Sequence, residues 1–341
     1  MLFCFCGLFL SIGDAEGAPD GPKIELKPVV ESFGSRHYVE AEALLAQRKW
    51  ADAAIAFRIA LRKNPDFTAA AMGLARALAF SGRREEALSL LWRFVDREKG
   101  SRRDALIRRA RVISRLFLTS ATFQTFQEGM NLLLAKKYRP ARDRFEKALE
   151  YEPDNIEILT RVGQCLVLDK DFDSAAERLR FAKRLNPHEP ELRIWLGRSM
   201  HQRGEIREAL EELRLAHLEL QGSELAPVWL AEAQFSFGQK PLAIQTLEED
   251  VKARPHHIES LLTLARLRIQ TATRETQTLW SARKDLQLAL SRLESYKTLD
   301  RRGFPENELT LDVRRTPEEI KSDADKLLQQ IENRLEQAAT Q

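Results

Sequence analysis

One spacing recurs along the chain and constrains its fold more than any other feature. A large, mostly apolar residue is followed after three, seven and ten positions by further apolar residues, and a proline often closes the unit five residues later. The clearest copies begin at Trp50, Tyr138, Phe172 and Ile206. Pro153 and Pro187 are 34 residues apart, and Pro187 and Pro255 are 68 apart, twice that interval. A repeat of this length predicts an array of stacked units, because no single unit can bury its own apolar face.

The offsets of three, seven and ten residues place the recurring side chains on one face of an α-helix. A composition with 31% charged residues but only 15 Gly and 13 Pro also favours helices. Small residues at fixed places let paired helices approach closely, while the larger residue between two alanines fills the remaining space. The small residues are Gly163, Ala175 and Ala182 in one unit, Gly197, Ala209 and Ala216 in the next, and then Ala231 and Ala243.

On these residues the chain resembles the tetratricopeptide repeat superfamily, and in particular its exported bacterial scaffold proteins. The resemblance implies an all-α fold, a solenoid in which antiparallel helix pairs form a right-handed superhelix. Two units are expected over 34–101 and five over 122–296, interrupted by an extra basic amphipathic helix at 102–121. The last unit carries a five-residue insertion within "TATRETQTLW", and a linker is expected at 297–315.

The N-terminal segment indicates export. An apolar run from Leu2 to Ile12 is too short to span a bilayer but is typical of a signal peptide, here residues 1–17, followed by a flexible leader at 18–33. No basic residue precedes Lys23, which a signal peptide would normally have. A misassigned start or a short buried segment are the alternatives. The sequence therefore predicts an exported, periplasmic or cell-envelope protein, and otherwise a cytoplasmic one.

A helix is predicted at the C-terminus, over 316–341. Thr316 is its expected N-cap, and Glu319 completes a capping box with it. One apolar face is formed by Ile320, Ala324, Leu327, Ile331 and Leu335. This face either covers the last repeat, as solenoids require, or pairs with a helix of another chain as a coiled coil.

The resemblance also implies where a partner would bind, because in this family the first helix of each pair lines the concave face. The expected partner-binding residues are Arg161, Gln164, Ile194, Trp195, Arg198, His201, Trp229, Glu232, Phe235 and Arg266. Trp195 and Trp229 are 34 residues apart and should lie side by side, forming an aromatic strip flanked by arginines. Trp and Arg often dominate binding interfaces. Alternatively, both tryptophans pack in the seam between repeats.

A second candidate surface is basic. Nine basic and three acidic residues lie between Arg93 and Arg115, and Arg102, Arg108, Arg111 and Arg115 are expected on the outer face of the extra helix. Such a face could meet anionic lipid, an acidic polysaccharide or an acidic protein, or it could simply be solvated. The net charge of +3 gives no case for nucleic acid.

The sequence shows no chemistry typical of an enzyme. The six histidines form no metal-ligand pattern, no phosphate-binding loop is visible, and Cys165 is expected to be a core thiol. We therefore expect neither catalysis nor a cofactor. The expected function is a scaffold that binds an extended peptide or amphipathic helix of a partner protein. A self-assembling, homo-oligomeric structural protein and a cytoplasmic adaptor with a misassigned start are the alternatives.

Overall fold

The computed structural model describes residues 35–220, 223, 225–272, 276–300 and 316–339. The expected signal peptide, the leader and most of the expected linker lie outside these residues. Within them, all regular structure is helical, in sixteen helices, so the predicted all-α class is confirmed. The chain divides into two compact units, one up to Phe123 together with Tyr151–Glu157, the other comprising Gln124–Glu150 and the chain from Ile158 on.

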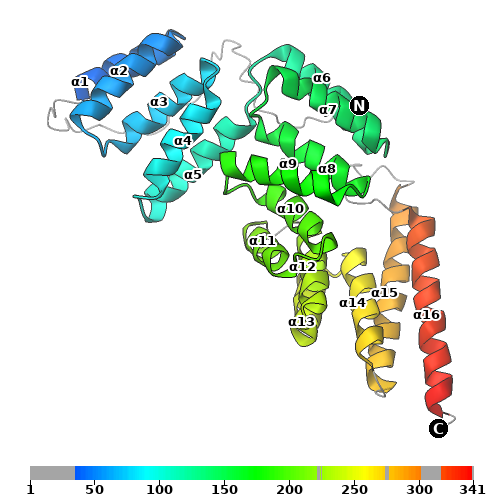
Figure 1. Cartoon of the computed structure of the whole chain (residues 1–341). Helices are drawn as coiled ribbons and strands as arrows, with labels where there is room; N and C mark the ends of the chain where they lie inside the picture. The colour runs from blue at the N-terminus through cyan, green and yellow to red at the C-terminus, as the bar shows by residue number, and fades with distance from the viewer. Residues whose placement is uncertain (1–34, 221–222, 224, 273–275, 301–315, 340–341) are drawn as a thin grey trace. The chain divides into compact units, whose positions relative to one another are not determined.

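The first unit contains two antiparallel helix pairs and one further helix (Figure 1). The helices are α1 (Ser35–Ala46), α2 (Trp50–Lys63), α3 (Thr68–Phe80), α4 (Arg84–Val95) and α5 (Gly100–Arg115). The first helices of successive pairs touch, because α1 contacts α3. Helix α5 packs on α4 and also contacts α3, so it occupies the place that the first helix of a third pair would take.

The helices from α6 on lie wholly or mostly in the second unit. They are α6 (Ser120–Leu134), α7 (Tyr138–Tyr151), α8 (Ile156–Leu168), α9 (Phe172–Leu185), α10 (Pro190–Gln202), α11 (Ile206–Glu219), α12 (Leu225–Ser236), α13 (Lys240–Ala253), α14 (Ile258–Thr271), α15 (Thr276–Asp300) and α16 (Pro317–Ala339). As in the first unit, alternate helices meet: α10 contacts α12, α12 contacts α14 and α14 contacts α16.

The glycines of the repeat confirm the expected close approach of paired helices. A Cβ atom added to Gly163 would lie 2.4 Å from the side chain of Leu179, and one added to Gly197 would lie 2.6 Å from Leu213. Both leucines are fully buried. In each pair the larger residue between two alanines thus fills the space that the glycine leaves open, as close packing of interiors requires.

Two expected boundaries are wrong. The extra helix ends at Arg115 instead of continuing to 121, because the carbonyls of Ile113 and Leu116 accept hydrogen bonds from the Arg84 side chain and Leu116 is extended. Helix α15 runs to Asp300, so the linker begins later than residue 297. Of the stretch that carries the insertion, Thr276–Trp280 form the start of this 25-residue helix.

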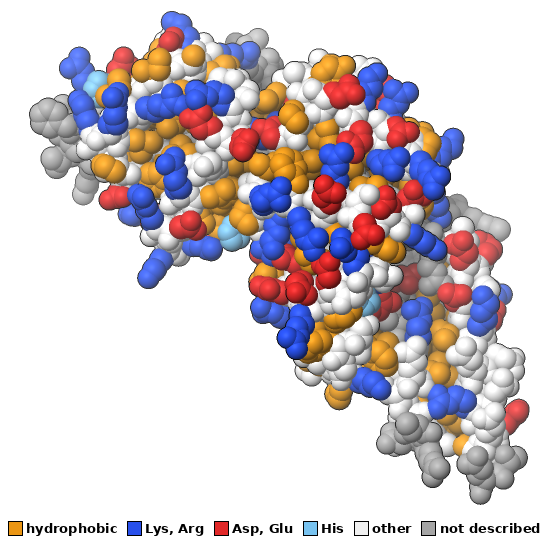
Figure 2. Space-filling model, in the orientation of Figure 1, with side chains coloured by type: hydrophobic (Ala, Val, Ile, Leu, Met, Phe, Trp, Pro, Cys, Tyr) orange, Lys and Arg blue, Asp and Glu red, His pale blue; other side chains and the backbone are white. Residues whose placement is uncertain are grey.

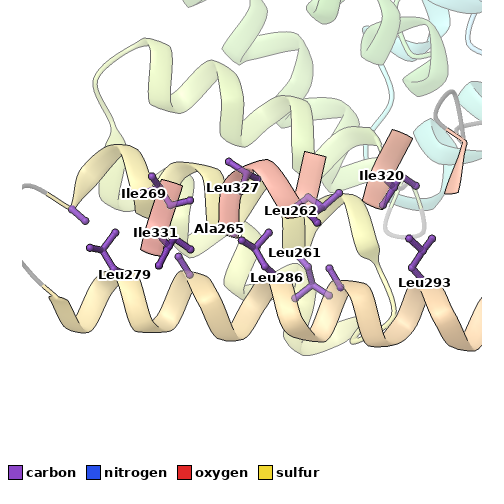
Figure 3. Packing of buried hydrophobic residues seen from close by; sticks show 14 residues of the cluster. Leu261, Leu262, Ala265, Ile269, Leu279, Leu286, Leu293, Ile320, Leu327 and Ile331 are labelled. Carbon is purple, nitrogen blue, oxygen red and sulfur yellow. The ribbon is translucent and has the colours of Figure 1, made fainter. Parts of the chain in front are cut away.

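Helix α16 begins with the expected capping box. The Thr316 N–H donates to Glu319 Oε2 at 2.6 Å, and the Glu319 N–H donates to Thr316 Oγ1 at 3.2 Å. Figure 3 shows Ile320, Leu327 and Ile331 of α16 packed with residues of α14 and α15. The apolar face of α16 is therefore buried within its own chain, which favours the capping interpretation over pairing with another chain.

Arg84 occupies the repeat position that Trp50, Tyr138, Phe172 and Ile206 hold elsewhere, and its side chain is fully buried in the first unit. It forms ion pairs with Glu152 at 2.6 Å and with Asp154. Glu152 also accepts hydrogen bonds from the N–H groups of Leu118 and Thr119. One buried cation thus ties α4, the end of α5 and the 151–157 segment together.

In the part of the chain that the structure describes, no helix has both the length and the apolar character needed to cross a membrane.

Candidate functional site on the first helices of the second unit

The first helices of successive pairs bring most of the predicted partner-binding residues to one face. Arg161 and Gln164 lie on α8, Trp195 and Arg198 on α10, Trp229 on α12 and Arg266 on α14. The rings of Trp195 and Trp229 meet edge to face, with centroids 5.2 Å apart. The prediction that the two tryptophans lie side by side is confirmed.

These tryptophans do not form an open strip, however. Trp195 is 3% exposed and Trp229 is 4% exposed, and Arg161, Gln164 and Ile194 are buried as well. The 34-residue spacing places the two indoles on adjacent helices at contact distance, where they fill the gap between those helices. Their burial corrects the expectation of an exposed aromatic strip and favours the seam packing that the sequence left open.

A partly exposed row of charged side chains crosses this face instead. Glu232 on α12 accepts a hydrogen bond from Arg198 on α10 at 2.5 Å and pairs with Arg266 on α14 at 3.6 Å. The Arg198 guanidinium also lies 5.2 Å from the ring centroid of Trp229. We call Arg198, Glu232 and Arg266 the charged row. Because Arg161 pairs with Glu191 in the same way, the arginines expected to be basic flanks are largely neutralised by carboxylates of the chain itself.

Two further predicted residues lie at the ends of α10 and α12. His201 Nε2 is 2.9 Å from the Ser236 hydroxyl, and burial, together with nearby Arg198, lowers the pKa of His201. His201 is therefore neutral at pH 7. Phe235 is half-buried, with the Lys240 ammonium 5.5 Å from its ring centroid. A ligand on this face would meet a neutral imidazole, an aromatic ring and the charged row.

A buried polar cluster on α13 and α14 escaped the sequence analysis. Asp250 stands where Ala60, Ala148, Ala182 and Ala216 stand in other units, and this break in the alanine pattern was the available signal. Asp250 Oδ2 lies 2.6 Å from His257 Nδ1 and accepts a hydrogen bond from the Ser260 hydroxyl at 2.6 Å. The Arg254 side chain also donates to Asp250 and to the Ser223 carbonyl.

This Asp–His–Ser cluster is not a catalytic triad. In a triad, the serine and the aspartate contact opposite nitrogens of the imidazole. Here the Ser260 hydroxyl, 2.7 Å from His257 Nδ1, shares that nitrogen with Asp250. All three side chains are also buried. The cluster connects the end of α13 to the start of α14 and has a structural role.

The lowered pKa of Asp250 leads us to expect that the fold loses stability in acid. Burial alone would raise the pKa of Asp250, but hydrogen bonds from His257, Ser260 and Arg254 outweigh it and lower the pKa from 3.8 to about 2. The charged form therefore stabilises the fold above pH 3.8, and this contribution is lost as the pH falls through about 2. We expect the native protein to have a higher free energy of unfolding than Asp250→Asn at pH 6. This difference between the two proteins should become about 2 kcal/mol smaller as the pH is lowered from 6 to 2. Urea unfolding of both proteins across this range measures it; a constant difference would contradict the assignment.

Two of the four arginines expected on the outer face of the basic helix α5 are less exposed than predicted. Arg102 and Arg108 are exposed, but Arg111 and Arg115 are half-buried, and Arg115 forms an ion pair with Glu157. The buried face of α5 consists of Leu106, Ala110, Ile113 and Ser114. Arg115 is half-buried because it lies in the last turn of α5, where its side chain contacts Glu157 of the 151–157 segment. The outer basic face is therefore smaller than the sequence predicted.

Cys165 is a buried thiol, as predicted. It is 1% exposed, and burial raises the pKa of its thiol to about 12. A thiol in this state is not nucleophilic near neutral pH. Among the described residues, no three His, Cys, Asp or Glu side chains are grouped so that they could hold a metal ion.

Comparison with protein families identifies repeats in both units. Two family models, each described as a tetratricopeptide repeat, match residues 38–101 and 166–226. No curated protein matches the chain significantly.

Several solved structures are similar to this chain. A tetratricopeptide repeat protein from Parabacteroides merdae is 13% identical, with 88% of this chain and 99% of that chain covered and a TM-score of 0.44. PilW, a widely conserved type IV pilus biogenesis factor, is 19% identical, with 64% and 92% covered and a TM-score of 0.47. Yeast Tom70 is 17% identical, with 94% and 68% covered and a TM-score of 0.42. At these low values the likenesses say nothing about what this chain binds.

Proposed function

Because this chain is a tetratricopeptide-repeat protein, we propose that it is a non-enzymatic scaffold that holds a segment of a partner protein on the first helices of its second unit. The observation that carries the proposal is the charged row of Arg198, Glu232 and Arg266, which crosses three successive first helices and stays partly exposed. A continuous row at the repeat interval suits a ligand that runs across the helices.

The chemistry of the face indicates the kind of segment that it would hold. Arg266 is the least tightly held cation of the row, since its 3.6 Å pair with Glu232 is long and its side chain is 35% exposed. A carboxylate of a partner could therefore bind Arg266 at little cost to the existing pair. Half-buried Phe235 follows Glu232 by about one helical turn on α12 and offers an apolar contact. We propose an extended peptide or amphipathic helix with an apolar anchor and an acidic residue. Its setting in an exported or cell-envelope assembly rests on the sequence of residues 1–17 alone.

A crosslinked pull-down from native lysate tests this function. The bait is the full chain, native or carrying Phe235→Ala with Arg266→Ala. The matched control carries Phe237→Ala with Arg207→Ala and likewise removes one aromatic ring and one arginine. Arg207 lies on α11, a second helix, and Phe237 follows the end of α12. Buried Trp195 and Trp229 are left intact, because truncating them would leave cavities in the fold.

We expect a protein captured by the native chain and by the control to be reduced at least fivefold with the Phe235 and Arg266 variant. All three baits should show the same helical content by circular dichroism. Equal capture by all three would refute the proposed face, and Arg102 and Arg108 of α5 would be the next surface to test.

A further inference from the structure

A groove with basic walls lies in the first unit, whereas the face discussed above belongs to the second unit. It has a volume of about 630 Å³ and is formed by α2, α3 and α4. Its floor is apolar, with Leu74 and Leu78 from α3 and Leu90 and Phe94 from α4, all four less than 10% exposed. On the α2 side, Ile55 is 56% exposed, a large apolar side chain that no repeat neighbour covers. The groove thus has the apolar lining typical of binding sites.

Arginines stand on both sides of this floor. Arg58 and Arg62 come from α2, while Arg93 lies in α4 and Arg97 in the turn that follows it. Arg58 and Arg62 are four residues apart on α2, which is about one helical turn, and Arg93 and Arg97 are also four residues apart in the sequence. Figure 2 shows basic side chains beside hydrophobic ones on the visible face of the first unit. The cations thus line the groove lengthwise in two pairs.

These arginines are only partly neutralised. Glu86 is the one carboxylate that lines the groove, and it already pairs with both Arg58, at 2.6 Å, and Arg83. Arg97 has a loose pair with exposed Asp66 at 3.9 Å.

Among the described residues, no carboxylate lies within ion-pair distance of Arg62 or Arg93. The groove therefore carries an excess of positive charge around an apolar floor.

We propose that this groove docks an acidic amphipathic helix of a partner protein. Apolar side chains of that helix, spaced at i, i+3, i+4 and i+7, would cover Ile55, Leu61 and Pro65, the apolar lining side chains that stay wholly or partly exposed. Its flanking Asp or Glu residues would meet the arginine pairs on the two walls. The charge excess is what selects an acidic partner over a neutral one. The arginines are distributed along the walls rather than converging on one point, which suits a helix better than a single small anion. This surface belongs to a different unit from the proposed peptide face and would act independently of it.

Fluorescence anisotropy with a defined probe tests the proposal. The probe is a fluorescein-labelled 18-residue helical peptide with Leu at the i, i+3, i+4 and i+7 positions and Glu on both flanks. Control peptides carry Lys in place of Glu, or the same residues in scrambled order. We expect the full chain to bind the acidic probe with a micromolar Kd, and to bind each control peptide at least tenfold more weakly.

Matched variants of the chain locate the binding. Arg62→Glu with Arg93→Glu should weaken binding of the acidic probe at least tenfold, whereas Arg102→Glu with Arg108→Glu, the same charge change on exposed positions of α5, should change it less than twofold. Ile55→Ser should weaken it about fivefold, but Val112→Ser, at a comparably exposed position on α5, should not. Circular dichroism verifies that every variant folds.

Four results would overturn the proposal. One is equal binding of the acidic and Lys probes, and another is an affinity of the Arg62→Glu with Arg93→Glu variant for the acidic probe equal to that of the native chain. The third is binding of the chain to phosphatidylglycerol vesicles, abolished by the same variant, without probe binding; this would assign the groove to a membrane surface. The fourth is self-association that the variant removes, again without probe binding, which would assign the groove to a second copy of the chain.

Discussion

Replacing Arg84 by methionine is expected to lower the free energy of unfolding of the first unit by about 3–5 kcal/mol, because it leaves a buried carboxylate without its cation. Glu152 is 3% exposed and would keep only neutral donors that the structure records, the Leu118 and Thr119 N–H groups and the Asn155 amide. The carbonyls of Ile113 and Leu116 would each lose one hydrogen-bond donor at the same time. Methionine restores the apolar volume typical of this repeat position, so the loss would come from polar groups and not from a cavity.

The matched control is Arg58→Met, which removes an arginine whose pair with Glu86 is about 40% exposed on both sides. A pair of this kind contributes about 0–1 kcal/mol. Urea unfolding followed by circular dichroism measures the native protein and both variants. The transition of the first unit is the one that Phe145→Ala, a substitution in the second unit, leaves unchanged. If the two substitutions shifted that transition equally, the buried network would not stabilise the first unit as described.

Replacing Phe145 by alanine is expected to destabilise the second unit by about 3–5 kcal/mol, the usual cost of removing a fully buried aromatic ring. Phe145 is 0% exposed, and its ring packs on Phe126 with centroids 5.4 Å apart. A Cβ atom on Gly129 would lie 2.6 Å from the same ring. With glycine opposite, nothing can move in to fill the space, so the cavity would persist.

Phe145→Leu is expected to cost much less, about 1–1.5 kcal/mol, because the chain itself combines glycine with leucine at this place in the next two units. Those combinations are Gly163 with Leu179 and Gly197 with Leu213. Phe181→Ala is the control, since Phe181 is 38% exposed on α9. Urea midpoints of the three variants provide the comparison. A midpoint for Phe145→Ala as high as that for Phe181→Ala would contradict the packing described here.

The repeat interval predicted the helices and their packing partners well, because both follow from local periodicity. The positions of small and large residues specified which side chains interlock, as Gly163 and Leu179 confirm. The capping box of α16 likewise depends only on residues three apart. These features need no knowledge of distant parts of the chain.

The features that sequence reasoning missed depend on distant or directional contacts. Arg84 and Glu152 are 68 residues apart, and nothing in either local pattern indicates that they pair. The spacing of Trp195 and Trp229 placed them on adjacent helices but did not determine whether their rings point outward or into the seam. Helix ends depend on capping contacts, such as the hydrogen bonds from the Arg84 side chain to carbonyls at the end of α5. The sequence does not show these contacts, so the predicted end of the extra helix at residue 121 was wrong.

The central claim, that a partner lies on the first helices of the second unit, is tested most directly by site-specific photocrosslinking. A benzophenone amino acid is placed in the full chain at Phe235 or His201 on the proposed face, and at Leu218 or Leu242 on second helices, where the side chains are 60% and 44% exposed. We predict that, after irradiation of intact cells, Phe235 and His201 give a crosslinked protein of the same mass, and that Leu218 and Leu242 do not. Crosslinks confined to Leu218 and Leu242 would contradict the claim.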